Sequence, residues 1–165
     1  MLADLPTAAG RRAAIDGVLA EVDGRLDGAI LAAGVGPSPG TDRPRLIFEV
    51  NYFGVVELLD GWRSALAGAD EAKVVVFGSN STTTTPLVPR RAIRALLAGD
   101  IEKALRALRI FGRNAPSIAY GTSCAVVPVA ARVYSNPIPW WPRVTSVCYS
   151  SCRAPRFGMS TRRGW

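Results

Sequence analysis

The chain has 165 residues, enough for one domain with a hydrophobic core and too few for two domains of ordinary size. Its hydrophobic content of 48% and charged content of 20% are typical of soluble globular proteins, and no run of about 18 apolar residues predicts a membrane span. The net charge of +7 raises the question of an acidic partner, and the absence of histidine excludes Ser-His-Asp catalysis, histidine zinc sites and histidine proton relays.

The first 70 residues alternate between helical and strand patterns. Residues 8–22 carry apolar side chains at helical spacing. Residues 26–34 form a short apolar run that ends in glycine, which predicts a buried strand, and residues 34–40 (GVGPSPG) read as a loop. A long helix is predicted over 42–67. Its apolar face comprises Ile47, Val50, Gly54, Val55, Leu58, Leu59 and Trp62.

The next segments repeat the alternation. Residues 73–79 (KVVVFGS) predict a second buried strand, and residues 89–99 and 100–112 predict two short helices. Asp100 is expected to cap the second of these helices and Gly112 to end it. Helices that alternate with strands indicate βαβ units and a parallel sheet, so the predicted fold class is α/β.

Polar residues and glycines follow both predicted strands, where an open parallel sheet binds its ligands. Gly34 opens the loop after the first strand and Ser79 ends the second, but loop glycines and turn serines are common. Asn51 lies in an otherwise apolar stretch and either bonds the neighbouring backbone or belongs to a site. Tyr120, at the start of another predicted helix, either packs with its hydroxyl at the surface or takes part in chemistry.

The order of these residues resembles the short-chain dehydrogenase/reductase family. LAAG at 31–34 is similar to the family's Asn-Asn-Ala-Gly motif, with Ala32 in place of an asparagine. Asn51 in VNYFG matches the helix asparagine, Ser79 the active-site serine and Tyr120 in YGTS the catalytic tyrosine. The two-helix segment before Tyr120 resembles the branch that contains bacterial 3α-hydroxysteroid dehydrogenase/carbonyl reductase.

The resemblance implies a Rossmann-like fold and NAD- or NADP-dependent oxidoreduction of a small-molecule alcohol or carbonyl, steroid-like or a small ketone. It implies catalytic roles for Asn51, Ser79 and Tyr120. It also implies cofactor contacts at Ala32, Ala33 and Gly34. Asp4 matches the family's aspartate after the third strand, which contacts the adenine side.

Two departures from the family pattern argue against activity. A tyrosine has a pKa of about 10, and a nearby lysine brings that pKa towards the working pH. The family's Tyr-x-x-x-Lys motif has Cys124 at its fifth position here, and no lysine follows Lys103. The chain is also expected to begin at the end of the third family strand, without the Gly-rich turn that receives the pyrophosphate. We therefore predict an inactive or nearly inactive chain.

The last part of the chain has a different composition. Residues 1–123 carry 14 basic and 13 acidic residues, a net charge of +1, whereas residues 124–165 carry six arginines and no acid, a net charge of +6. The second segment also holds all three cysteines, and Pro137, Pro139 and Pro142 disfavour regular structure. We expect an incomplete Rossmann-like domain at 1–123 and an irregular Pro/Arg/Trp-rich tail at 124–165.

The tail has two candidate origins: a genuine proline-rich extension, or a shift of the coding frame near Cys124, which sequencing the gene would distinguish. Three cysteines without metal-binding spacing, and an N-terminal segment unlike a secretory signal, predict a cytoplasmic protein.

Two other classes of function stay open. One is a non-catalytic protein that pairs with an intact relative, because this family commonly forms oligomers, homo-oligomers included, through long helices. The other is nucleic-acid binding by the tail, with Trp140, Trp141 and Trp165 as stacking groups. Six arginines spread over the whole tail make no dense patch, which argues against nucleic acid as the partner.

Overall fold

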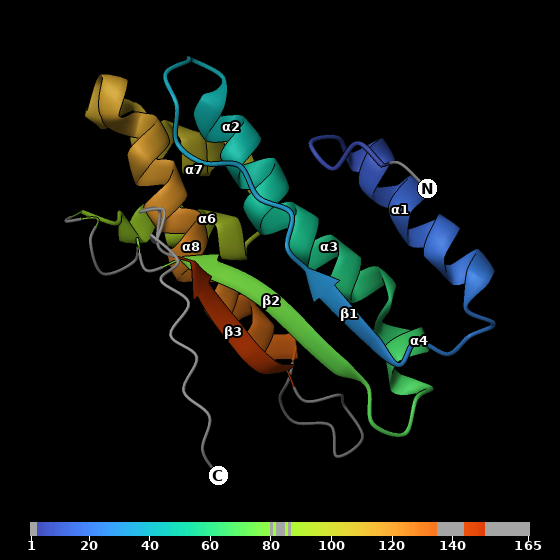
Figure 1. Cartoon of the computed structure of the whole chain (residues 1–165). Helices are drawn as coiled ribbons and strands as arrows, with labels where there is room; N and C mark the ends of the chain where they lie inside the picture. Colours follow the sequence, from blue (N-terminus) through green and yellow to red (C-terminus); the bar gives the residue numbers. More distant parts are fainter. Residues whose placement is uncertain (1–2, 80, 82–84, 86, 135–143, 151–165) are drawn as a thin grey trace, which may run out of the picture.

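The structure is a computed structural model that describes residues 3–79, 81, 85, 87–134 and 144–150, with side chains described as far as residue 127 (Figure 1). The tail tryptophans and the three prolines between 137 and 142 lie outside the described residues. The stacking hypothesis for the tail therefore stays a prediction.

Three parallel strands form one sheet in the order β1-β2-β3. They are β1 (Gly28–Leu31), β2 (Lys73–Ser79) and β3 (Val144–Ser150). The carboxyl ends of all three strands point to the same end of the sheet, towards the loop that follows β1 (Figure 1). The predicted parallel sheet and the α/β class are confirmed.

The helical region between β1 and β2 is divided into more segments than the sequence pattern predicts. α1 spans Ala8–Glu21, and the predicted helix at 42–67 is divided into α2 (Arg43–Phe48), a π-helical segment (Glu49–Phe53), α3 (Gly54–Gly61) and α4 (Arg63–Ala67). The apolar period continues through these breaks because each break turns the axis only locally.

The two short helices predicted before Tyr120 are α6 (Arg90–Leu97) and α7 (Ile101–Leu108). A 3₁₀ segment (Arg109–Asn114) joins α7 to α8 (Ala115–Tyr134). Gly112 lies inside this connection with φ +51°, so it provides the bend before α8 rather than the end of α7.

The expectation of an irregular tail is wrong for two segments. α8 continues past Cys124 to Tyr134, and β3 places a strand within the tail. The composition of the tail obscured both elements. β3 (VTSVCYS) nevertheless has the β-branched residues that favour strands, and its Val147 pairs with Val76 of β2.

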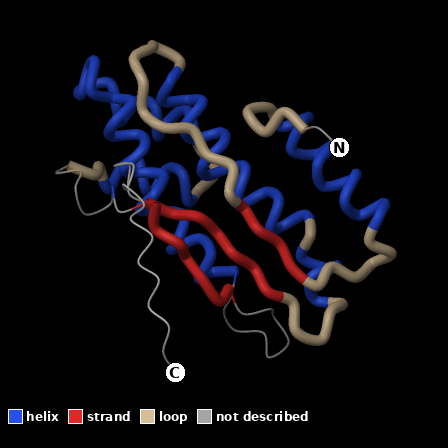
Figure 2. The backbone as a smooth tube through the Cα atoms, in the orientation of Figure 1, coloured by secondary structure: helices blue, strands red, loops and turns tan. Residues whose placement is uncertain are grey.

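The hydrophobic core lies between one face of the sheet and the helices, which gather behind the sheet in Figures 1 and 2. Burial alternates along β2, where Val74 and Val76 are buried and Phe77 is exposed. All seven residues of the apolar face predicted for 42–67 are buried. The amphipathic pattern thus identified the core-facing side correctly, although the helix is broken.

Candidate active site

A cavity of about 190 Å³ lies at the carboxyl ends of β1 and β2. It is the place where an open parallel sheet binds ligands. The loop after β1, the π-helical segment, the end of β2 and one face of α8 form its wall. The lining residues are Ala32, Ala33, Gly34, Val35, Gly36, Asn51, Phe77, Gly78, Tyr120, Ser123, Cys124 and Val127.

Asn51 holds the loop after β1 in place. Its side-chain amide donates to the Val35 carbonyl at 3.0 Å, and its Oδ1 accepts from the Val35 N–H at 2.8 Å. The donor and the acceptor of the Asn51 amide therefore both bond the backbone of Val35. Asn51 lies in the π-helical segment, where the Gly54 N–H bonds to the Glu49 carbonyl five residues earlier. Such short π segments are frequent at functional sites.

Tyr120 and Cys124 lie one helical turn apart on α8, and both line the cavity. Cys124 is only 7% exposed. Between them, the buried Ser123 hydroxyl donates to the Tyr120 carbonyl at 2.9 Å. A Cβ at Gly121 would lie 2.6 Å from Thr85 Oγ1, so only a glycine lets α8 approach the loop after β2 this closely.

Ser79 ends β2 beside this cavity but does not line it. Its side chain is 1% exposed, and its Oγ lies 3.0 Å from the Ser81 hydroxyl and accepts from the Ser81 N–H at 3.2 Å. The preceding residue, Gly78, forms part of the cavity wall. Ser79 is therefore next to the cavity, with its hydroxyl directed to the turn that follows β2.

The structure does not bring Asp4 to the cavity. Asp4 is exposed and lies just before α1, where its carbonyl accepts from the backbone N–H and the hydroxyl of Thr7. A Cβ on Gly10 would lie 2.0 Å from this carbonyl oxygen, so the segment packs tightly on the first turn of α1. Its observed contacts are those of a helix start.

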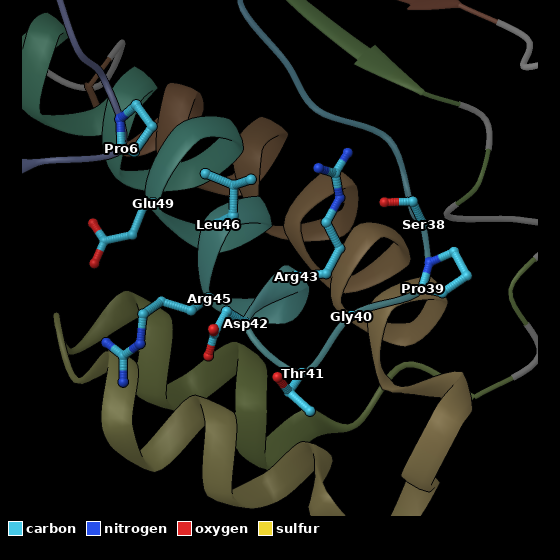
Figure 3. Close-up of a pocket in the computed structure, with 10 residues that line it drawn as sticks. All are labelled: Pro6, Ser38, Pro39, Gly40, Thr41, Asp42, Arg43, Arg45, Leu46 and Glu49. Carbon is cyan, nitrogen blue, oxygen red and sulfur yellow. The ribbon is translucent and has the colours of Figure 1, made fainter.

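A second cavity, of about 520 Å³, lies between the segment before α1 and α2 (Figure 3). Three of the four charged side chains that line it bond within the protein. Arg43 donates to the Gly36 carbonyl at 2.9 and 2.6 Å, and Arg45 pairs with Glu102 of α7. Glu49 pairs with Arg11 at 2.8 Å. Among these lining charges, those of Arg45 and Glu49 are therefore neutralised by ion pairs.

Arg11 itself is 4% exposed and joins α1 to the following helices. Its guanidinium binds Glu57 through two nitrogens, at 2.7 and 3.0 Å, and also donates to the Leu5 carbonyl. Burial by itself would lower the pKa of Arg11, but the hydrogen bonds and charges of Glu57 and Glu49 outweigh burial and raise it. Arg11 therefore stabilises the packing of α1, and it does not line the cavity at Tyr120.

Within the described part of the chain, no group of three or more metal-ligating side chains comes together. None of the helices described there is both long and apolar enough to cross a membrane.

The sequence of the chain is similar to that of a known dehydrogenase. No family model matches the chain. The chain is 32% identical over 170 aligned positions to 3-alpha-hydroxysteroid dehydrogenase/carbonyl reductase from Comamonas testosteroni. The match covers 97% of this chain and 65% of that protein. It therefore extends past Ser123 into the tail.

Solved structures agree with this match. The 3-alpha-hydroxysteroid dehydrogenase from Pseudomonas sp. B-0831, crystallised with NADH, superposes with a TM-score of 0.71 at 35% identity, over 82% of this chain and 52% of that chain. The chain is short-chain dehydrogenase/reductase-like in sequence and fold. A bulky-bulky ketone specific alcohol dehydrogenase from Comamonas testosteroni shares the fold, with a TM-score of 0.53 at 16% identity over 82% of this chain and 44% of that chain.

This short-chain dehydrogenase/reductase-like chain spans about two thirds, 65%, of the curated relative it matches. The cavity unites the sequence-predicted residues Ala32, Ala33, Gly34, Asn51 and Tyr120, and it leaves out Ser79 and Asp4.

Sequence reasoning missed several cavity residues. Val127 could have been found from its spacing of seven residues from Tyr120, which places both on one helical face. Phe77 and Gly78 could not have been found in this way. The alternation of residues along β2 predicts which face of the sheet a side chain lies on, but not which residues border a cavity.

Proposed function

We propose that the cavity at Tyr120 is an alcohol/carbonyl oxidoreduction site that uses NAD or NADP, and that its proton transfer is weak. The observation that carries the proposal is the meeting of Tyr120, Asn51 and residues 32–34 in one cavity at the carboxyl ends of parallel strands. The 35% identity to a dehydrogenase structure that contains NADH supports it. The substrate class is a small ketone or a steroid-like carbonyl and the corresponding alcohol.

The described residues fit the reacting end of such a cofactor rather than a whole dinucleotide. A cavity of about 190 Å³ is smaller than the roughly 300–1,000 Å³ of pockets that enclose complete ligands. A Cβ at Gly36 would meet no atom within 4 Å, so a flat ring has room beside the loop. In this proposal residues 32–34 hold the nicotinamide end, and the bound cofactor supplies or takes the hydride. A role for Asp4 on the adenine side stays a prediction.

The protein's own contribution is the proton and its placement. Tyr120 gives a proton to the substrate oxygen during carbonyl reduction and takes it back during alcohol oxidation. Ser79 donates a hydrogen bond to the same oxygen after a change of its χ1 rotamer turns Oγ from Ser81 towards the neighbouring cavity. Asn51 is a positioning residue, because its amide is used on Val35, whose loop forms the cavity wall.

Cys124 is the reason for the weak proton transfer. Among the described residues that line the cavity, none is a lysine or an arginine. A thiol cannot carry a positive charge, so Cys124 does not favour a phenolate at Tyr120 in the way that the lysine of the family motif would. A protonated phenol can still act as the acid of carbonyl reduction. It cannot act as the base of alcohol oxidation, so reduction is expected to be the faster direction.

The test is turnover by the purified chain with NADH or NADPH, small ketones and a 3-ketosteroid. We expect slow reduction that Tyr120→Phe abolishes. Tyr52→Phe is the matched control, because it removes a buried tyrosine hydroxyl from a residue that does not line the cavity and keeps the ring contact with Phe53. Turnover that survives Tyr120→Phe would exclude the proposed site, and fast oxidation at neutral pH would exclude the role given to Cys124.

A further inference from the structure

The nearly neutral net charge of residues 1–123 conceals a strong separation of charge. Residues 90–113, which include α6 and α7, carry seven basic and two acidic residues, a net charge of +5. The other residues of 1–123 carry seven basic and 11 acidic residues, a net charge of −4. The positive charge of the folded body is therefore concentrated on one helical hairpin.

The hairpin has a groove of about 600 Å³ between its two helices. α6 contributes Arg91 and Arg94 to the groove, and α7 contributes Lys103 and Arg106. All four side chains are exposed. The apolar part of the lining consists of alanines, at positions 95, 98 and 107, which leave the groove wide. None of these residues lines the Tyr120 cavity.

The four groove cations are not used to hold the fold together. The ion pairs among the described residues involve none of them, in contrast to Arg45 and Glu49 at the cavity beside α2. Glu102, the acidic neighbour on α7, is directed to Arg45 instead. Asp100 is the single acid in the groove lining, so the groove has a net charge of +3.

The turn between the helices fixes the groove. Gly99, with φ +74°, donates to the Leu96 carbonyl, and the Asp100 N–H donates to the Ala95 carbonyl, which together form a Schellman cap on α6. Asp100 then caps α7, because its Oδ1 accepts from the Lys103 N–H at 2.8 Å. This confirms the predicted Asp100 cap. Two consecutive caps leave little freedom in the angle between α6 and α7.

We propose that the groove between α6 and α7 binds a soluble ligand that carries two or more phosphate groups. Guanidinium groups bind phosphate oxygens in a bidentate manner and keep their charge at every physiological pH. Four cations exceed what a single carboxylate or phosphate would neutralise. The groove volume of about 600 Å³ lies within the roughly 300–1,000 Å³ of small-molecule sites. The alanine floor offers no large apolar side chain to insert into a lipid layer.

The experiment uses the full chain with inorganic tripolyphosphate as the probe and isothermal titration calorimetry as the measurement. Binding is expected to weaken as ionic strength rises. Arg94→Gln or Arg106→Gln should each reduce the affinity on the order of tenfold, because each removes one charge-assisted contact to phosphate. Arg12→Gln is the matched control: Arg12 is an exposed arginine of α1, away from the groove. It should leave the affinity unchanged.

Three outcomes would overturn the proposal: no binding of tripolyphosphate, an equal loss of affinity in Arg12→Gln, or binding that the groove variants leave intact. A parallel measurement adds vesicles of phosphatidylserine and phosphatidylcholine. Binding to these vesicles without any response to tripolyphosphate would also overturn it and would assign the basic hairpin to a membrane surface. Circular dichroism of each variant separates loss of the groove from loss of the fold.

Discussion

At the scale of single residues, position 124 controls the chemistry available to Tyr120. The two side chains are four residues apart on α8, a spacing at which helical side chains interact. Both line the same cavity. A cation at this position would act directly on the phenol, whereas a thiol brings no positive charge.

Cys124→Lys is therefore expected to restore proton transfer. The introduced ammonium should lower the pKa of Tyr120 and raise the rate of alcohol oxidation at neutral pH by up to about tenfold for each unit of pKa shift. The measurement is the pH profile of the rate, whose midpoint should move to lower pH. Cys124→Met introduces a side chain of similar length to lysine but without charge, so it should leave the pH profile of the rate unchanged. An identical profile in the lysine variant would disprove the electrostatic account.

The contribution of Asn51 to stability can be tested by substitution. In the contacts described above, its amide bonds only the Val35 backbone. Asn51→Leu keeps the volume and removes both hydrogen bonds. Because Val35 is only half-buried, its freed N–H and carbonyl retain some access to water. We expect a loss of about 1 to 2 kcal/mol in the free energy of unfolding. Urea unfolding measures this loss. Asn51→Asp keeps one acceptor, so its free energy of unfolding should lie between those of the parent chain and Asn51→Leu. Unchanged stability in Asn51→Leu would show that the loop is held by other contacts.

At the scale of elements, regular patterns were predictable and local departures from them were not. The period of apolar residues over 42–67 identified seven buried positions, since burial follows the average helix axis. It missed five others that are also buried: Pro44, Phe48, Tyr52, Ala65 and Leu66. The π-helical segment at Asn51 has no comparable signature. Asn51 in this segment bonds the backbone of Val35, 16 residues earlier, and such a contact leaves no local period in the sequence. β3 was missed for a related reason: the unusual composition of the tail obscured its β-branched residues, and its pairing with β2 cannot be read from the sequence.

Arg11 shows how a tertiary contact overrides a sequence pattern. It lies in a predicted amphipathic helix, where a charged residue is ordinarily solvent-facing, yet it is buried between α1 and α3. Its raised pKa means that its stabilising charge is fully present below the ordinary arginine pKa and is lost only as pH rises through the higher folded value. The contribution of the arginine charge is thus constant across neutral pH.

Arg11→Met should detach α1 partially from α3. A methionine fills the space but leaves Glu49 and Glu57 without their shared cation, and Glu57 is 38% exposed. We expect a loss of about 2 to 4 kcal/mol, at the lower end of the range for breaking buried ion pairs because water reaches Glu57. Thermal unfolding with increased hydrogen exchange in α1 measures it. Arg12→Met, on the exposed face of α1, is the control. Equal losses in the two variants would contradict a specific role for Arg11.

At the scale of the whole molecule, the described helices cover one face of the sheet only. Parallel sheets ordinarily have both faces covered, and their strands are apolar on both sides for that reason. Here Ile30 of β1 is 72% exposed and Phe77 of β2 is 46% exposed. Both lie on the face opposite Val74 and Val76. The chain also corresponds to 52% of the superposed NADH-bound dehydrogenase. An apolar sheet face of this kind favours association between molecules.

Replacing the two exposed apolar side chains with threonine should therefore reduce association without unfolding the protein. The double variant Ile30→Thr with Phe77→Thr places a β-branched residue at each position, so strand propensity is preserved while apolar surface is removed. Sedimentation velocity over a range of protein concentrations should show less concentration-dependent association than in the parent chain. Val74→Thr is the control on the opposite face of the same strand. Because Val74 is 1% exposed, its replacement should instead lower the free energy of unfolding by about 1 to 3 kcal/mol. If association persists in the double variant, another surface drives it, and the uncovered sheet face is tolerated in water.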